Sequence, residues 1–385
     1  MLMRPPLLQM LLLCCASFAL GFSLANAAFS PSRSPINLNH GLKARACLPR
    51  KDRLAQMVTD DKFLPSKQFG LQPPDLTLLA PAKINLFLRI LGRREDGFHE
   101  LASLFQTVSL FDTLDFWSSP ADDSQPLYSM EVTDSSLCAD LIPTDESNLV
   151  MKALHAFSER TSSKQRLHCR LHKEIPAEGG LGGGSSDAAT ALHAANRLAG
   201  FPLSEDELIK LAADLGSDVG FFLSGGTAYC TGRGELVDFR KPLEPCTIYL
   251  IKPKVGCSTP AVYGALGLEK GQQLSGLDPE ALLKEFEEGS IYKATFINDL
   301  EPPAFQVVPL LREIKEDLEK LGFPAVMMSG SGSTIFCIGS PGADAPNNWQ
   351  EELVAKYDVD IFEQASCSRL NNANLWYAEQ PAETS

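Results

Sequence analysis

The sequence predicts a two-domain protein of the α+β class, preceded by an N-terminal targeting segment. Its 385 residues exceed the roughly 100–200 residues of an average domain. A hydrophobic fraction of 44% and a charged fraction of 21% are those of an ordinary globular chain, which excludes disorder, collagen and coiled coil as descriptions of the whole. Strand-like and helix-like patterns both recur along the chain, and no repeat of about 20–50 residues indicates a solenoid or propeller.

The first 28 residues have the pattern of a secretory signal peptide. A single early charge, Arg4, precedes an apolar run over 7–20, which is shorter than the roughly 20 residues that cross a bilayer. The small residues of 25–28 then offer a cleavage site. A membrane anchor or a buried helix is the alternative, and the length of the run disfavours both, so we expect no stable membrane association.

A second targeting segment follows the first. Residues 29–51 contain Lys and Arg but no Asp or Glu, with Ser and Pro scattered among them, a composition typical of transit peptides. We therefore expect a transit peptide and linker over 29–75. A signal peptide followed by a transit peptide, with Phe29 at the junction, resembles the bipartite presequences of plastids bounded by extra membranes. This resemblance implies the stroma of a complex plastid as the destination.

The net negative charge of the chain limits the kinds of molecule that it is expected to bind. The formal net charge is −14, and loss of the basic presequence would make the remainder more acidic still. Binding to nucleic acid depends mainly on Lys and Arg that neutralise phosphates, so we expect no nucleic-acid partner. A small anionic substrate remains compatible, because local groups can receive it. The oligomeric state cannot be predicted from these patterns.

The cysteines indicate free thiols. Seven follow the presequence: Cys138, Cys169, Cys230, Cys246, Cys257, Cys337 and Cys367. They are odd in number, widely scattered and without a C-x-x-C pair, which favours neither a disulfide framework nor a zinc site. Buried thiols in a reducing compartment are the simpler interpretation.

The periodicity of apolar residues predicts the elements in order. In the first half we expect strands over 76–90, 101–117 (broken at Asp112) and 167–171, a polar turn over 92–97, and helices over 148–158, 185–198 and from Ser204, where Glu207 completes a capping box. In the second half we expect strands over 248–252, 325–328 and 334–338 and helices over 259–266, 280–287, 309–321 and 348–357. Two prolines interrupt the pattern at 241–245. We place the domain boundary there, with an N-terminal domain over 76–242 and a C-terminal domain over 243–378.

The most informative segment is the glycine cluster in residues 175–189, which read IPAEGGLGGGSSDAA. Glycines let the backbone approach a ligand closely and expose successive N–H groups, and the positive end of the following helix adds to their attraction for phosphate. No Gly-Lys-Ser or Gly-Lys-Thr occurs in the chain, which excludes a Walker A loop. The cluster also lacks a clean G-x-G-x-x-G. A flexible linker is disfavoured, because the loop runs directly into an alanine-rich helix.

A second loop of small residues, MSGSGST over 328–334, lies between two expected strands. Alone it is no more than a turn. Together with the glycine cluster it indicates two walls of one ligand cleft, one wall from each domain.

These segments resemble a known superfamily. PAKINLFL, IPAEGGLGGGSSDAA and MSGSGST, in this order, are similar to the three motifs of the GHMP kinases. The resemblance implies an N-terminal domain like ribosomal protein S5 domain 2 and a ferredoxin-like C-terminal domain. More narrowly, DGFHEL, LGSDVGFF, TGRGE and NDLEPPAF resemble the members, especially the plastid forms, that phosphorylate 4-diphosphocytidyl-2-C-methyl-D-erythritol in the non-mevalonate isoprenoid pathway. This narrower resemblance therefore implies ATP and Mg²⁺ as cofactors and the 2-hydroxyl of that cytidine-diphosphate-linked alcohol as the phosphoryl acceptor.

The resemblance also implies roles for individual residues. Asp218 matches the base that accepts the hydroxyl proton, and Lys83 matches the cation beside the reacting hydroxyl. That pairing is physically reasonable, because a nearby cation favours an ionised carboxylate and stabilises charge on the transferring group. Without the resemblance, Lys83 reads as a surface lysine at a strand end and Asp218 as an acid at a helix terminus.

The remaining implied positions divide between the two substrates. The resemblance implies that Asn85, which shares a strand face with Lys83, binds the substrate. It also implies that Phe98, His99 and Tyr263 surround the cytosine. A flat base is well recognised by the face of an aromatic ring together with a hydrogen-bond donor and acceptor. Nucleotide binding falls to Gly179, Gly180, Gly182, Gly183, Gly184, Ser185, Ser186, Asn148 and Lys173. The metal ligands stay unknown, since Ser185 and Ser186 fit either Mg²⁺ or phosphate.

Two departures and three alternatives accompany this interpretation. Glu178 puts a negative charge beside the glycines, and Gly220 stands where the superfamily usually has proline after the Asp-Val pair. The alternatives are a GHMP kinase for another small alcohol, a non-catalytic nucleotide-binding protein descended from such a kinase, and a nicotinamide oxidoreductase. DGFHEL opposes the first, the presence of Lys83 and Asp218 opposes the second, and the poor dinucleotide fingerprint opposes the third.

Overall fold

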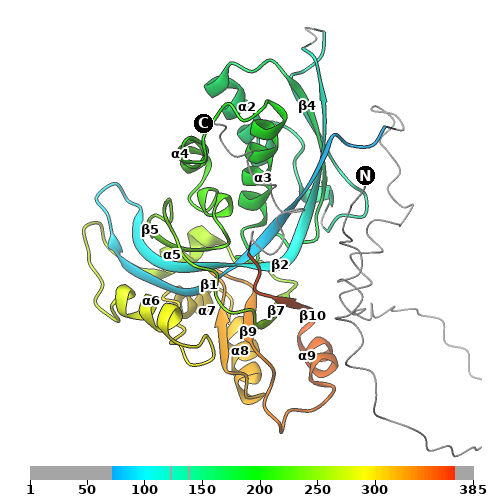
Figure 1. Ribbon diagram of the computed structural model, residues 1–385. Coiled ribbons are helices and arrows are strands. Elements are labelled where there is room, and N and C mark those ends of the chain that lie inside the picture. Colours follow the sequence, from blue (N-terminus) through cyan, green and yellow to red (C-terminus); the bar gives the residue numbers. More distant parts are fainter. Residues whose placement is uncertain (1–71, 122–123, 138, 369–385) are drawn as a thin grey trace, which may run out of the picture. The chain divides into compact units, whose positions relative to one another are not determined.

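The computed structural model describes residues 72–121, 124–137 and 139–368 (Figure 1). The described residues all belong to one compact unit. The predicted signal peptide over 1–28 and nearly all of the transit peptide and linker over 29–75 lie outside the described residues, as does Cys138. In the part that is described, no helix has the length and apolar character needed to cross a membrane.

The first sheet is built on two very long antiparallel strands, β1 (Leu76–Arg93) and β2 (His99–Ser119). Its order is β3–β4–β2–β5–β6, with β1 also paired to β2. The remaining strands are β3 (Tyr128–Val132), β4 (Arg166–His172), β5 (Thr227–Gly232) and β6 (Leu236–Phe239). The pairing of β3 with β4 is parallel and the other pairings are antiparallel.

Helices α2 (Leu149–Thr161), α3 (Gly183–Leu198) and α4 (Glu205–Leu215) lie together on one side of β1 and β2 (Figure 1). Their apolar faces share a core with the first half of β1. Alanines fill α3, so the helix approaches the strands closely and is buried through its middle. At the start of α4, Ser204 and Glu207 form the predicted capping box.

The second sheet has four antiparallel strands in the order β10–β7–β9–β8. Its strands are β7 (Thr247–Pro253), β8 (Ala325–Met328), β9 (Ile335–Ile338) and β10 (Val359–Ala365). The helices of this half are α5 (Thr259–Leu266), α6 (Pro279–Glu288), α7 (Glu301–Val307), α8 (Leu310–Lys320) and α9 (Trp349–Tyr357). The strand order and the helices between the strands are those of a ferredoxin-like fold, as predicted.

Both faces of the second sheet are covered. Ile248 and Leu250 of β7 belong to a core shared with the second half of β1 and with α6. Their neighbour Ile251 belongs to another core, which includes residues of α7, α8 and α9. Successive side chains of a strand point to opposite faces, so β7 joins the two cores, and the second half of β1 packs against the second sheet.

Several expectations about the elements need correction. The break expected at Asp112 was wrong: β2 continues through this residue, and the nearest of the three register shifts in its pairing with β1 lies between Pro81 and Ala82. Gly92 was expected in a turn but belongs to β1. The sequence reading missed β3, β5, β6, β10 and α7. The first sheet ends before 241–245 and the second begins after it, while the division into domains over 76–242 and 243–378 stays a prediction.

Candidate active site

A pocket of about 900 Å³ lies where the two loops of small residues meet. Gly180 and Gly182 of the glycine cluster and Gly330 and Ser331 of the second loop contribute to its walls. The loops are directly joined, because the Ser329 hydroxyl donates to the carbonyl of Gly180 at 2.9 Å. The expectation that the loops form two walls of one cleft is therefore confirmed.

Lys83 and Asp218 meet at this pocket. The ammonium of Lys83 lies 3.5 Å from a carboxylate oxygen of Asp218. Lys83 is only 4% exposed, and its ammonium also lies 4.7 Å from the centre of the Phe105 ring. A cation held this way cannot swing into solvent, so its charge stays directed at the carboxylate and at whatever lies beside it.

Asn85 fixes the other side of the ammonium. Lys83 donates to the Asn85 side-chain oxygen at 2.8 Å, and the Asn85 amide donates to the Ser103 hydroxyl at 2.9 Å. Ser103 in turn donates to the carbonyl of Phe87. The predicted shared strand face of Lys83 and Asn85 is confirmed. Ser103 supports the pair from β2, and no sequence pattern identified it.

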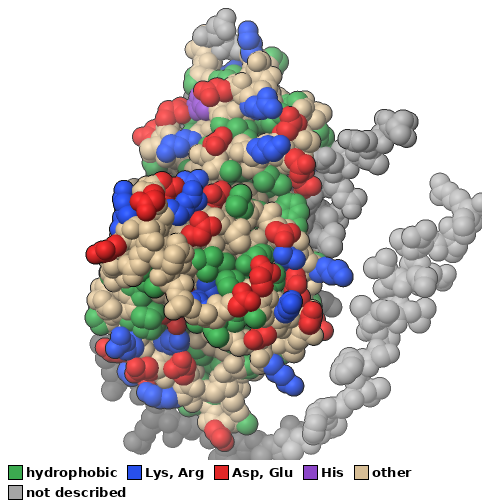
Figure 2. Space-filling view, turned by 90° about the vertical axis from the view of Figure 1, so that its left-hand side faces the viewer, with side chains coloured by type: hydrophobic (Ala, Val, Ile, Leu, Met, Phe, Trp, Pro, Cys, Tyr) green, Lys and Arg blue, Asp and Glu red, His purple; other side chains and the backbone are tan. Residues whose placement is uncertain are grey.

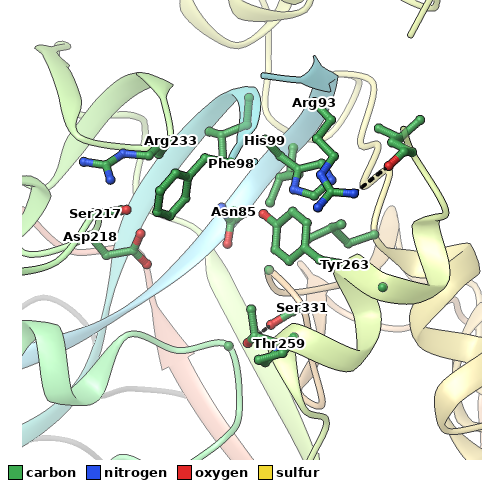
Figure 3. Close-up of a pocket in the computed structure, with 18 of the residues that line it drawn as sticks. Asn85, Arg93, Phe98, His99, Ser217, Asp218, Arg233, Thr259, Tyr263 and Ser331 are labelled. Atoms are coloured by element: carbon green, nitrogen blue, oxygen red, sulfur yellow. Dashed lines mark hydrogen bonds between the residues drawn. The ribbon is translucent and has the colours of Figure 1, made fainter. Parts of the chain in front are cut away.

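Aromatic side chains form the opposite end of the pocket (Figure 3). The rings of His99 and Tyr263 have centres 4.7 Å apart and are tilted by 38° to each other, and Phe98 is 52% exposed. The Nε2 atom of His99 is buried and has no hydrogen-bond partner, so its hydrogen-bonding capacity is unused. Burial, with a smaller contribution from Arg93, lowers the pKa of His99, so the neutral ring is favoured.

Tyr263 and two arginines complete this end. Burial, with a smaller contribution from the charge of Asp218, raises the pKa of Tyr263 to about 12, so its hydroxyl keeps its proton near neutral pH. Arg93 donates to the carbonyls of Gly97 and Leu268. Arg93 and Arg233 line the pocket but were missed by the sequence reading, although Arg233 stands in the quoted segment TGRGE.

The glycine cluster adopts the conformation that its composition predicts. Gly180 and Gly182 have φ of 72° and 71°, a region that favours glycine. A Cβ atom on Gly180 would lie 2.1 Å from the carbonyl oxygen of Ser329, so no side chain fits. The helix α3 starts at Gly183, two residues before the predicted start. Its N-terminus therefore lies at the loop, which is the arrangement that attracts phosphate.

A second pocket of about 430 Å³ adjoins the glycine cluster. The predicted nucleotide residues Asn148, Lys173, Ser185 and all five glycines line it. Asn148 also caps α2, because its side chain accepts from the backbone of Val150 at 2.8 Å. These placements are compatible with nucleotide contacts, and the roles of the residues stay predictions.

The ammonium of Lys173 belongs to a buried cluster of charged side chains beside the glycine cluster. This ammonium donates to Asp112 and, at 2.8 Å, to Asp187 of α3. Burial opposes the charge of Lys173, but the two carboxylates outweigh it and raise its pKa. Burial also raises the pKa of Asp187 to about 8, despite Lys173. One cation facing two buried carboxyl groups explains both directions, because one carboxylate balances it and the other favours a proton.

The two departures from the superfamily pattern occupy different surroundings. Glu178 is exposed on the rim of the second pocket, with φ of 52°. Gly220 is buried at the start of a short 3₁₀ helix, η2 (Gly220–Leu223), two residues after Asp218. A Cβ atom there would find its nearest neighbour 3.6 Å away, so the position does not require glycine for space.

The described residues can be compared with the expectations about metal ligands and about free cysteines. Among the described residues, no group of three or more His, Cys, Asp or Glu side chains could hold a metal ion. The hydroxyl of Ser186, in the first turn of α3, is buried and has no partner. Six cysteines lie within the described ranges, and all six are free and buried: Cys169, Cys230, Cys246, Cys257, Cys337 and Cys367. This matches the expectation of free thiols for these six.

Comparison with known proteins places these features in context. Residues 148–226 match the model of the GHMP kinases N-terminal domain, and residues 280–356 match that of the GHMP kinases C-terminal domain. The chain is 46% identical over 309 residues to the chloroplastic 4-diphosphocytidyl-2-C-methyl-D-erythritol kinase of Oryza sativa subsp. japonica, covering 79% of this chain and 73% of that protein. It is 40% identical over 307 residues to the kinase of the same name from Protochlamydia amoebophila, covering 80% and 94%.

Solved structures show the same relationship. A crystal structure of 4-(cytidine 5'-diphospho)-2C-methyl-D-erythritol kinase covers 76% of this chain and 100% of its own, with a TM-score of 0.60 and 32% identity. A homoserine kinase from Cytophaga hutchinsonii aligns with a TM-score of 0.57 at 18% identity, over 80% of this chain and 97% of its own. The second likeness concerns the fold alone.

Proposed function

Since this chain belongs to the 4-diphosphocytidyl-2-C-methyl-D-erythritol kinases of the GHMP superfamily, we propose that its large pocket holds that alcohol with the 2-hydroxyl between Lys83 and Asp218. The chain is an ATP-dependent kinase of the non-mevalonate isoprenoid pathway. The observation that carries the placement of the reaction is the distance of 3.5 Å between the Lys83 ammonium and the Asp218 carboxylate. The ring groups of Phe98, His99 and Tyr263 at the other end of the pocket suit the cytosine.

The chemistry follows from this placement. As the 2-hydroxyl oxygen forms a bond to the γ-phosphorus, the bond from that phosphorus to the bridging oxygen of ADP breaks, and Asp218 accepts the hydroxyl proton. Lys83 neutralises charge on the transferring group, and Asn85 holds the ammonium at 2.8 Å. Phosphoryl transfer needs mainly alignment and charge stabilisation. Here the buried side chains of Lys83 and Asn85 supply the fixed cation, and the partly exposed Asp218 faces it.

The nucleotide is assigned to the glycine cluster. The N-terminus of α3 and the bare amides of the loop suit the phosphates, and the second pocket, with Asn148 on its wall, suits the base. The loop also contacts the reacting pair, because the Lys83 backbone donates to the carbonyl of Leu181 at 2.9 Å. The γ-phosphate would therefore approach Lys83 from the loop.

The described residues fit a Mg²⁺ ion that is held mainly by ATP. The ion favours oxygen ligands and keeps several waters, so it needs few protein groups. The unpartnered Ser186 hydroxyl beside the loop would supply one oxygen, with Ser185 as the neighbouring candidate. When bound, Mg²⁺ neutralises phosphate charge.

A coupled ADP-release assay with the full chain and a panel of alcohols tests the proposal. We expect turnover with 4-diphosphocytidyl-2-C-methyl-D-erythritol and none with mevalonate, homoserine or galactose. Turnover with one of those instead would favour another GHMP kinase. Nucleotide binding without turnover on any alcohol would favour the non-catalytic alternative, and retention of NAD would favour the oxidoreductase.

The partners and location are proposed on separate grounds. On the face in Figure 2, Lys and Arg side chains are interspersed with Asp and Glu and form no single basic surface, which supports a small-molecule substrate over nucleic acid.

Chloroplastic relatives and the pattern of residues 1–75 support the stroma of a complex plastid as the location. A fluorescent protein fused behind residues 1–75 should accumulate in the stroma, whereas secretion or cytosolic fluorescence would contradict this location.

A further inference from the structure

The hairpin between β5 and β6 places an arginine against the aromatic end of the pocket. Arg233 lies at the tip of this hairpin, between Gly232 with φ of 73° and Gly234 with φ of 112°. Its guanidinium lies over the Phe98 ring, 4.8 Å from the ring centre. In Figure 3, Arg233 is on one side of Phe98, and His99 and Tyr263 are on the other.

Phe98 needs support from a side chain because the residue is 52% exposed. The backbone around it is fixed, since the Phe98 amide donates to Asp96 at 3.0 Å and its carbonyl accepts from Arg94 at 2.7 Å. These bonds hold the chain but not the ring, whose side-chain torsions would otherwise be free to vary in solvent. A planar guanidinium stacks well on an aromatic face, so Arg233 restricts the orientation of the ring.

The arginine is itself held in place. The Arg233 amide donates to the carboxylate of Glu235, and the guanidinium lies 3.5 Å from the same carboxyl group. The neighbouring Gly234 packs against the other end of the site, because a Cβ atom on it would lie 3.6 Å from an Asp218 oxygen. One hairpin tip therefore contacts the ring at the base end and lies close to the carboxylate at the hydroxyl end of the pocket.

We propose that Arg233 is a positioning residue for the cytosine: it stacks on the outer face of Phe98 so that the inner face is presented to the base. This inference rests on the proposed function, and it adds a residue that acts through the ring and not by touching the substrate. The order of the stack is then guanidinium, phenyl ring, cytosine.

The test uses four variants of the full-length chain: Arg233→Gln, Arg233→Lys, Phe98→Ala and the double variant Arg233→Gln/Phe98→Ala. Arg312→Gln is the matched control, because Arg312 lies over the Phe305 ring and outside the residues that line the pocket. The measurements are KM for the cytidyl substrate, KM for ATP, Tm, and Kd for cytidine and for cytidine diphosphate. Cytidine lacks phosphate, so it separates a ring effect from a contact with the diphosphate.

Arg233→Gln should raise KM for the cytidyl substrate about two- to fivefold, the scale of an exposed cation–π contact. Both Kd values should rise by the same factor, while KM for ATP and Tm stay unchanged. Arg233→Lys should recover part of the loss, because it keeps the charge but not the planar group. In the Phe98→Ala background, Arg233→Gln should have no further effect. The control should match the unmodified chain.

Three outcomes would overturn the inference. A loss of affinity for cytidine diphosphate but not for cytidine would mean that Arg233 contacts phosphate. An undiminished loss of affinity in the Phe98→Ala background would mean that Arg233 acts independently of the ring. A lowered Tm with equal changes in both KM values would mean a structural role. If the unmodified chain phosphorylates another alcohol, the proposed function fails, while the cytidine Kd still tests the stack. If the unmodified chain does not bind cytidine at all, the inference fails with it.

Discussion

The ammonium of Lys83 and the carboxylate of Asp218 lie 3.5 Å apart, although Lys83 belongs to β1 and Asp218 to the segment after α4. The glycine cluster is part of the same arrangement. A Cβ atom on Gly182 would lie 3.0 Å from Lys83 Cγ, and the Lys83 amide donates to Leu181. The loop that suits phosphate and the pair that suits the acceptor hydroxyl are therefore packed directly against each other.

Asp218→Asn should retain nucleotide binding and lower kcat by about 10²-fold or more, because the amide cannot accept the hydroxyl proton. ATP binding by calorimetry and steady-state turnover check this expectation. Asp214→Asn is the control, since Asp214 is an exposed aspartate on α4. Near-normal turnover of Asp218→Asn would remove Asp218 from its proposed role.

Phe98→Ala should raise KM for the cytidyl substrate about fivefold to 150-fold and leave KM for ATP unchanged, given about 1–3 kcal/mol for a base stacked on an aromatic ring. Phe239→Ala on β6 is the control, because Phe239 is similarly exposed at 45% and lies outside the lining of the pocket. Equal changes in both KM values would instead mean that Phe98 supports the fold.

Gly182→Ala should lower kcat/KM for ATP by about tenfold or more. Its φ of 71° costs an alanine about 1–2 kcal/mol, and the new methyl group would meet the Phe222 ring at 2.9 Å and displace Lys83. Gly200→Ala separates strain from position, since Gly200 has φ of 81° but no neighbour within 4 Å of a Cβ atom. Comparable losses in kcat/KM for the two variants would contradict the assignment of the loop.

Asp187 should make stability depend on pH. Its pKa is about 8 in the folded protein and 3.8 in its ordinary state, so the folded chain retains a proton that the unfolded chain has released. The resulting stabilisation is full below pH about 4, falls as the pH rises and is lost above about 8, with a slope of up to about 1.4 kcal/mol per pH unit.

Asp187→Asn removes this titration. Urea unfolding between pH 5 and 9 should show the unmodified chain losing stability relative to the variant up to pH about 8, with a constant difference above it. Parallel profiles for the two chains across this range would show that Asp187 does not titrate as described.

Most elements could be predicted from the sequence because their apolar residues follow a clear period. The helix from Ser204 shows this best, since the capping box with Glu207 is visible in the chain. The short β6 (Leu236–Phe239) was missed because three of its four residues are exposed and leave no alternation to detect. The strand break predicted at Asp112 was wrong, because in the sequence alone a buried aspartate looks like a polar residue that ends a strand. Its partner Lys173 is visible only in the structure.

The candidate site was predicted in part. Resemblance supplied Lys83 and Asp218, the composition of residues 175–189 supplied the glycine cluster, and the structure brings all of them together. The resemblance could not supply Ser103, Arg93 or Arg233, because their importance depends on pairings such as the stack of Arg233 on Phe98. Lys173 shows the converse case, in which the ammonium of an expected nucleotide residue is engaged by Asp112 and Asp187.

The most direct test of the account identifies the product. The full chain should be incubated with ATP, Mg²⁺ and 4-diphosphocytidyl-2-C-methyl-D-erythritol, and the mixture followed by ³¹P NMR. The account predicts one new phosphomonoester, coupled to the 2-position of the erythritol and formed in equal amount with ADP. A phosphate on another hydroxyl, or ADP formed with free phosphate and no new ester, would contradict it.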